Sequence, residues 1–179
     1  LEQLAGKGHS TVVIGIDGQC AALAALADAI RPNARACADR LGGLGVNTAI
    51  VTGDNARTAE AVAAQLEISE VFAEISPEGK QSKVEERRRM GRRVAFVGDG
   101  INDAPALAAT DVGITFASAT DVAMGAADIT IVHDDLMRLP AVVQLARRSV
   151  RTIKQNLFWA FFYNVAAIPL AAAGIVAPG

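Results

Sequence analysis

GDGINDAPAL, residues 98–107, is the stretch that decides the fold of this chain. The run RRVAFV precedes it and the run DVGITF follows it, and both are predicted to be buried strands. Gly98 and Gly100 allow the chain to turn tightly just past the end of the first strand. Asp99 and Asp103 are therefore expected at the carboxyl edge of a parallel sheet, where open α/β sheets bind ligands.

The polar side chains of this stretch are suited to a metal ion. Asp99, Asn102 and Asp103 are hard oxygen donors within five residues, of the kind that bind Mg²⁺. Asn102 and Asp103 can also cap the helix expected to begin at Ala104-Pro105, with proline near its first position. A bare GDG would be compatible with turning and capping alone, whereas the full ten-residue string favours a metal site.

Apolar and β-branched runs alternate with helix-forming segments along the chain. Strands are predicted in TVVIGI (11–16), VNTAIV (46–51), SEVFAEI (69–75), RRVAFV (92–97), DVGITF (111–116) and DITIV (128–132). Helices are predicted over 21–30, 33–44, 55–66 and 77–89, and from 104 onward. This alternation predicts an α/β protein with a Rossmann-like parallel sheet covered by helices on both faces.

Composition narrows the class of protein. The formal net charge of −2 gives no support for binding to nucleic acid. Cys20 and Cys37 are far apart and form no CxxC motif, so we interpret them as reduced thiols. The chain begins at Leu1 and ends within an apolar stretch, which we interpret as a fragment of a longer protein.

Two further loops follow predicted strands and are expected at the same sheet edge. In TGDN, residues 52–55, Thr52 can bind a phosphoryl oxygen, Gly53 permits close backbone approach, and the following helix N-terminus favours an anion. Lys80 lies in the first turn of a predicted helix, where its charge opposes the helix dipole, so a phosphate partner would explain it. Taken singly, TGDN is compatible with a turn and cap, and Lys80 with a solvated surface lysine.

The three loops together resemble the phosphorylation domain of the P-type ATPases, within the haloacid-dehalogenase-like phosphotransferases. The resemblance covers nearly the whole chain. It implies that Thr52 and Lys80 steady a phosphorylated aspartate, that Asp99 binds Mg²⁺, and that Asn102 and Asp103 order the site. Gly53 and Asp54 of the TGDN loop, and Asp103 as a second Mg²⁺ ligand, complete the candidate set. The implied chemistry is phosphoryl transfer from ATP by positioning and charge neutralisation.

The segment Asp28-Ala29-Ile30-Arg31-Pro32 resembles the family's DxxRP segment. The resemblance implies that Asp28 and Arg31 face the bound nucleotide. Their i,i+3 spacing fits a helix-surface ion pair equally well. A mild departure from the family follows DVGI, where TFASATDVAMGAAD has Phe116 and Ala117 in the turn and Gly125 where an acid is common.

The family's nucleophile is the aspartate of a DKTGT motif, which this sequence does not contain. The family inserts its nucleotide-binding domain after that motif, so we expect both to lie upstream of Leu1. The chain alone is therefore expected not to form an aspartyl-phosphate. Asp17 follows a predicted strand, but its surroundings, IDGQC, lack the lysine and threonines, and we interpret it as a turn residue.

The character of the chain changes near residue 136. Residues 136–156 are amphipathic and basic and predict a connecting helix, and residues 157–177 contain no charged side chain. A stretch of that length can cross a bilayer as a helix, and the basic residues before it predict that this end is cytoplasmic. A buried helix of a soluble protein is the alternative interpretation. The predicted domains are thus a catalytic part, 1–135, the connecting helix, 136–156, and a transmembrane helix, 157–177.

The pair Tyr163-Asn164 resembles the seventh transmembrane helix of copper-transporting P-type ATPases, where such a pair helps form the metal site. Asparagine within an apolar segment is costly unless it has a function or pairs with another helix. Zinc and cadmium relatives typically carry a lysine in that helix, and no lysine follows Lys154 here. The family's other Cu(I) ligands come from a Cys-Pro-Cys helix, which this sequence lacks.

The favoured interpretation is therefore a fragment of a membrane-bound, multi-pass copper exporter with its catalytic part in the cytoplasm. The resemblance implies Mg²⁺, ATP and transported Cu⁺ as cofactors and cargo. Implied partners are membrane lipid, the upstream remainder of the same polypeptide and, as a further candidate, a copper chaperone. The alternatives are a transporter of zinc, cadmium or another heavy metal, and a membrane-tethered, non-catalytic haloacid-dehalogenase-like module. A soluble phosphatase fits poorly, because the nucleophile motif is absent and the tail is uncharged.

Overall fold

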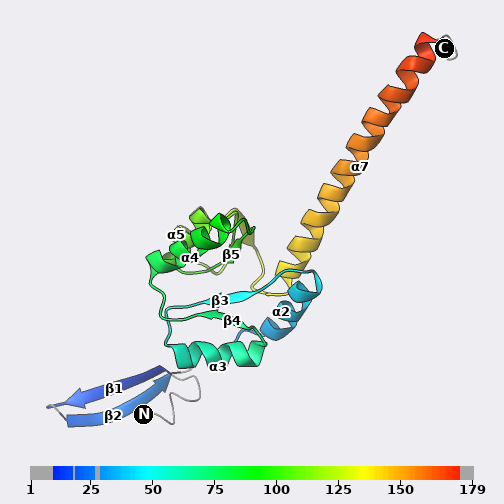
Figure 1. Ribbon diagram of the computed structural model, residues 1–179. Coiled ribbons are helices and arrows are strands. Elements are labelled where there is room, and N and C mark those ends of the chain that lie inside the picture. The colour runs from blue at the N-terminus through cyan, green and yellow to red at the C-terminus, as the bar shows by residue number, and fades with distance from the viewer. Residues whose placement is uncertain (1–9, 18, 27–28, 174–179) are drawn as a thin grey trace. The chain divides into compact units, whose positions relative to one another are not determined.

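A computed structural model describes residues 10–17, 19–26 and 29–173 of the chain. The chain divides into two compact units, Leu1–Arg138 and Leu139–Gly179, which we describe separately. The first unit contains the strands and short helices of the described residues, and the second contains most of one long helix (Figure 1).

The first described element of this unit is a β-hairpin. Strand β1 (Ser10–Ile16) pairs antiparallel with β2 (Gln19–Leu26), and Ile16 lies opposite Gln19 across the turn. Asp17 in the turn has a φ of 50°, the left-handed conformation that two-residue hairpin turns require. The helix predicted over 21–30 is therefore wrong for 21–26. Alanine and leucine favour a helix locally, but pairing with the β-branched partner strand outweighs that propensity.

Five short strands form the parallel part of the structure. Strand β3 (Ala49–Val51) pairs with β4 (Glu70–Phe72), and β5 (Ala95–Val97), β6 (Val112–Phe116) and β7 (Ile129–Ile131) form a sheet in the order β5-β6-β7. All three pairings are parallel, which confirms the predicted α/β fold with a parallel sheet. Among the described residues, β3 and β5 each pair with a neighbouring strand on one side only.

The helices follow the strands largely as predicted. They are α2 (Ala34–Gly43), α3 (Ala56–Leu66), α4 (Pro77–Arg89), α5 (Ala104–Ala109) and α6 (Asp121–Ala126), the last of which was not predicted. Asn55 caps α3 by accepting a hydrogen bond from the Thr58 amide, as the sequence indicated. A short 3₁₀ turn, Ile101–Asp103, precedes α5.

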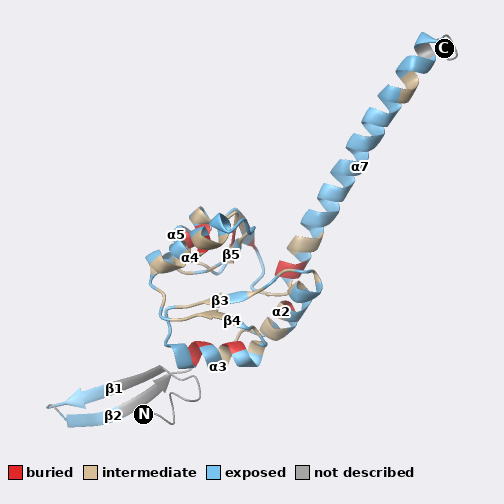
Figure 2. Cartoon of the chain, in the orientation of Figure 1, coloured by how far each residue is buried: buried red, intermediate tan, exposed pale blue. Residues whose placement is uncertain are grey.

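The core of the first unit lies around β6. Its last four residues are buried, and Leu107 and Ala106 of α5 and Ala123 of α6 are almost fully buried as well. Figure 2 shows further buried residues on α3. Thr115 is completely buried, and its hydroxyl donates to the Gly98 carbonyl over 2.7 Å. The core thus holds the end of β5 in place, and with it the start of the GDGINDAPAL loop.

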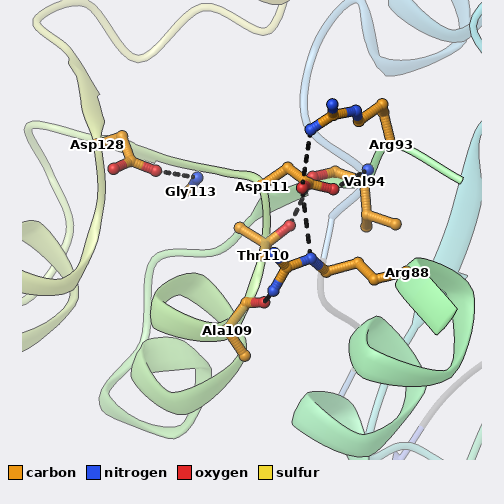
Figure 3. Close-up of polar contacts among 8 residues, drawn as sticks. All are labelled: Arg88, Arg93, Val94, Ala109, Thr110, Asp111, Gly113 and Asp128. Carbon is orange, nitrogen blue, oxygen red and sulfur yellow. Dashed lines mark hydrogen bonds and ion pairs between the residues drawn. The ribbon is translucent and has the colours of Figure 1, made fainter. Parts of the chain in front are cut away.

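The carboxylate of Asp111 links the starts of β5 and β6 (Figure 3). It accepts a hydrogen bond from the Val94 amide over 2.9 Å and lies 3.3 Å from the Arg88 guanidinium and 3.4 Å from that of Arg93. The Thr110 hydroxyl adds a hydrogen bond to the Val94 carbonyl. These contacts set the parallel register of the two strands.

The second unit contains most of the long helix α7 (Arg138–Ala172), with Pro169 inside it. Residues 138–156 of the basic connecting stretch and residues 157–172 of the uncharged stretch, predicted as two segments, belong to this single helix. No helix among the described residues is long and apolar enough to cross a membrane, so the transmembrane helix predicted over 157–177 is not confirmed. Within α7 the uncharged stretch covers residues 157–172, about 24 Å at 1.5 Å per residue, and residues 174–177 lie outside the described part.

Replacing Asp111 with asparagine should make the stability of the fold depend differently on pH. The pKa of the Asp111 carboxyl lies below its ordinary value of 3.8, chiefly because the carboxylate accepts the Val94 hydrogen bond. A lowered folded-state pKa means that the charged group stabilises the fold above pH 3.8, and that this stabilisation is lost as the pH falls through the folded-state pKa. We expect the wild type to have a higher free energy of unfolding in urea than Asp111→Asn near neutral pH. The difference should shrink below the ordinary pKa, and a constant difference there would contradict the assignment.

Candidate functional site

Hydrogen bonds join the loops that follow β3 and β4. The Ile75 amide donates to the Thr52 carbonyl over 3.0 Å, and the Glu74 amide donates to the Asp54 carbonyl over 2.8 Å. The Ser76 hydroxyl then accepts from the Gly79 amide and begins α4 as its N-cap. The loop containing Thr52 is thereby linked to the first turn of the helix that contains Lys80.

Lys80 connects this pair of loops to the loop after β5. Its ammonium lies 2.7 Å from Asp103 Oδ1, and the two side chains are only 15% and 14% exposed. Asp103 also packs against Gly98, where an added Cβ would lie 2.6 Å from the Asp103 Cβ. The glycine is required because the aspartate occupies the space of a side chain at that position. A cation and a carboxylate are therefore held together where the three loops meet.

Thr52 and Asp54 form a local pair in the first of these loops. The Thr52 hydroxyl donates to Asp54 Oδ2 over 2.8 Å and accepts from the Asp54 amide over 3.1 Å. Thr52 is half-buried, whereas Gly53 and Asp54 are exposed. This arrangement leaves the Gly53 backbone open to solvent, beside a hydroxyl whose orientation is fixed.

Arg31 connects the GDGINDAPAL loop to a second carboxylate. Its guanidinium donates to Asp99 Oδ2 over 2.6 Å and also pairs with Asp134, in the loop after β7. The centre of the guanidinium lies 5.2 Å from the centroid of the Phe116 ring, within the range of a cation–π contact. The Asp99 carbonyl accepts from the Thr120 amide over 3.1 Å, which fixes the backbone of the loop.

The structure thus brings several of the predicted residues together. It joins Lys80 to Asp103 and Arg31 to Asp99, and Asn102 is exposed in the turn between these two aspartates. Asp28 lies outside the described residues. Tyr163 and Asn164 are exposed neighbours on α7. The catalytic and ligand roles of all these residues remain predictions.

A divalent ion would find few protein donors at this site. No cluster of three or more His, Cys, Asp or Glu side chains suited to a metal occurs among the described residues. Mg²⁺ is commonly held through one or two carboxylates together with waters and phosphate oxygens, rather than in an all-protein cage. The Asp99 side chain is 53% exposed, so its carboxylate is accessible for such a contact. The donors present therefore fit Mg²⁺ shared with a phosphate.

Two residues of this site were missed from the sequence. Asp134 follows β7 at the carboxyl edge of the same sheet as Asp99, and the acidic pair after the run DITIV was the available signal. Thr115 was assigned only to a strand, although its buried hydroxyl holds the Gly98 carbonyl. Nothing in the local sequence distinguishes such a threonine from an ordinary strand residue.

Comparison with known proteins agrees with this geometry. The sequence model of the haloacid dehalogenase-like hydrolases matches residues 1–111, more than half of the chain. The chain belongs to the haloacid dehalogenase-like hydrolase family. Within it, the chain is similar to copper-exporting P-type ATPases, as the sequence motifs indicated.

The similar curated proteins are much longer than this chain. It is 47% identical over 177 residues to copper-transporting ATPase 1 of Rhizobium meliloti and 44% identical over 178 residues to the copper-exporting P-type ATPase of Bacillus subtilis. Each alignment covers 99% of this chain, which spans 21% and 22% of the two relatives. The chain thus spans about a fifth of the length of these proteins.

Solved structures show the same relationship. A zinc-transporting PIB-type ATPase in the E2.Pi state matches 98% of this chain with a TM-score of 0.86 and 34% identity, over 29% of its own length. The catalytic domain of the CPx-ATPase CopB-B matches 73% of this chain with a TM-score of 0.62 and 28% identity, over 53% of its own length.

Replacing Gly98 with alanine should damage the site through a steric clash. The new Cβ would lie 2.6 Å from the Asp103 Cβ, so the aspartate or the loop must shift, at a cost of about 1–3 kcal/mol in the free energy of unfolding. The matched control is Gly125→Ala in α6, where an added Cβ meets nothing within 4 Å and a small gain is expected. Urea unfolding measures both, and equal effects of the two substitutions would contradict the packing argument.

Proposed function

We propose that this chain is part of a copper-transporting P-type ATPase and supplies the half of its catalytic site that binds Mg²⁺ and stabilises phosphate. The observation that carries the proposal is the partly buried pair of Lys80 and Asp103 at the junction of three loops. A lysine is seldom this well covered without a partner, and here its ammonium lies beside the loop of Asp99. The similarity to copper-exporting P-type ATPases supports the same function.

Each residue of the site has a task in phosphoryl transfer. The Thr52 hydroxyl and the Gly53 amide bind oxygens of the phosphoryl group, and the Lys80 ammonium neutralises part of its charge. Asp103 keeps Lys80 in place, and Asn102 orders the turn between the aspartates. Asp99, and Asp103 as a second ligand, would hold Mg²⁺, which supplies further charge neutralisation when bound. Arg31, together with Asp28, would face the nucleotide.

The nucleophilic aspartate would come from a part of the polypeptide outside this chain. Strands β3 and β5 each have one edge without a partner among the described residues, and Ala95 and Val97 of β5 are exposed. An incoming parallel strand would satisfy the hydrogen-bonding groups of such an edge. A strand that ends in the nucleophile would then deliver its carboxylate beside Lys80 and Asp99.

The transported ion is proposed to be Cu⁺, in a membrane protein whose catalytic part is cytoplasmic. Several curated relatives carry copper in their names, and the uncharged residues after Lys154 would continue into the bilayer. Tyr163 and Asn164 would lie on the path of the ion and offer a phenol and an amide oxygen. The second candidate cargo is zinc, because a zinc-transporting PIB-type ATPase has a TM-score of 0.86 with this chain.

Replacing Asp99 with alanine in the full-length protein should abolish formation of the phosphoenzyme from ATP. The Asp99 side chain is 53% exposed, so its loss should affect catalysis far more than folding. Labelling with radioactive ATP, followed by acid quench, measures the phosphoenzyme, and the thermal midpoint of unfolding serves as the folding control. Turnover close to that of the wild type would show that Asp99 does not hold the metal. The 179-residue chain alone should incorporate no label.

The copper assignment predicts a separate defect in Asn164→Ala. Cu(I)-dependent turnover and Cu(I) binding should fall, whereas phosphorylation by inorganic phosphate should persist, because that reaction uses the cytoplasmic loops. An asparagine that only bonds to a neighbouring helix would instead cost about 1–3 kcal/mol of stability on replacement and leave Cu(I) affinity unchanged. Equilibrium titration with Cu(I) in detergent separates the two roles. Unaltered stoichiometry and affinity would rule out Asn164 as a ligand.

A further inference from the structure

The guanidinium of Arg31 lies between two carboxylates that come from different strands. One terminal nitrogen donates to Asp99 Oδ2 over 2.6 Å, and the other pairs with Asp134 Oδ1. The three side chains are 36%, 53% and 52% exposed, respectively. Arg31 thus bridges Asp99 and Asp134.

The surrounding backbone fixes this arrangement. Asp99 follows β5 and Asp134 follows β7, the strands on either side of β6 in the parallel sheet. Phe116, at the end of β6, is almost fully buried and places its ring against the guanidinium. The loop of Asp134 is ordered by two hydrogen bonds of Asp135, from its own amide to the His133 carbonyl and from the Met137 amide to its carboxylate.

The net charge of these three side chains affects how strongly Asp99 attracts a divalent cation. Arg31 contributes one positive charge and the two aspartates contribute two negative charges, so the group carries a net charge of about −1. If Arg31 neutralised Asp99 alone, the pair would be neutral and would attract a divalent cation less strongly. Asp134 competes for the same guanidinium and restores a negative charge at the exposed edge of the site.

We propose that Asp134 is a positioning residue that tunes Mg²⁺ affinity at Asp99 by sharing the guanidinium of Arg31. The inference rests on the proposed function, in which Asp99 holds the metal. It assigns Arg31 a role beyond facing the nucleotide, namely holding Asp99 in place while leaving it incompletely neutralised. Asp134 itself does not contact the metal or the phosphate.

This charge-sharing role predicts shifts of opposite sign for the two partners of Asp99. Asp134→Asn leaves Arg31 to neutralise Asp99 and should weaken Mg²⁺ binding about three- to tenfold. Arg31→Gln removes the competing cation and should tighten Mg²⁺ binding by a similar factor. A purely structural role for the Arg31–Asp134 pair would weaken binding in both variants or in neither.

The test is a titration of the full-length protein with MgCl₂ by isothermal titration calorimetry, without nucleotide. Asp134→Glu keeps the charge and should restore an affinity within about twofold of the wild type. The matched control is Asp39→Asn, which removes the carboxylate from another exposed arginine pair, that of Arg35 and Asp39. It should leave Mg²⁺ affinity unchanged. Thermal unfolding without Mg²⁺ shows that each variant is folded.

The outcomes distinguish this inference from the function on which it rests. Asp99→Asn should abolish the binding of Mg²⁺, and if it does not, the metal site itself is misplaced. If Asp99→Asn abolishes binding while Asp134→Asn and Arg31→Gln shift the affinity in the same direction, or not at all, charge sharing is refuted and the metal site stands. Tighter binding in Arg31→Gln is the decisive result, because a structural role predicts no tightening in that variant. In Asp134→Asn, unchanged or tighter binding would refute charge sharing even if Arg31→Gln does not fold.

Discussion

The Lys80–Asp103 ion pair is the contact on which the arrangement of the site depends. It joins the first turn of α4 to the turn that precedes α5, and so connects the β3–β4 half of the first unit to the β5–β6–β7 half. Both side chains are largely covered by protein, so removal of either partner would leave a poorly solvated charge, which is costly. The packing of Asp103 against Gly98 leaves the carboxylate little freedom to turn away.

The other polar contacts of the site are more exposed, and this difference suits their proposed tasks. Arg31, Asp99 and Asp134 are about one third to one half exposed, so each can exchange partners when a phosphate or a cation arrives. An exposed ion pair contributes little to stability, typically below about 1 kcal/mol. The site therefore combines the largely buried Lys80–Asp103 pair, which maintains its geometry, with the more exposed group of Arg31, Asp99 and Asp134. That group can respond to a ligand.

Side-chain contacts help the short strands to position these loops. Strands β3, β4, β5 and β7 have three residues each, too few to define a sheet by themselves. Side chains supply the missing constraint, because Asp111 fastens the starts of β5 and β6 and Thr115 holds the Gly98 carbonyl at the end of β5. The carboxyl end of β5, where the Asp99 loop begins, is thereby placed by side-chain contacts at both ends of the strand.

The sequence by itself determined the parallel α/β fold, the family and the bounds of α4, because each rests on local chemistry. Ser76 and Pro77 begin α4 and Asn55 begins α3 through hydrogen bonds and dihedral preferences within one turn. Tertiary structure decided what depended on a distant partner. Residues 21–26 form a strand because β1 pairs with them, although alanine and leucine favour a helix. The contact between Arg31 and Asp134 spans 103 positions along the chain, a separation at which periodicity and motif spacing carry no information about charge pairing.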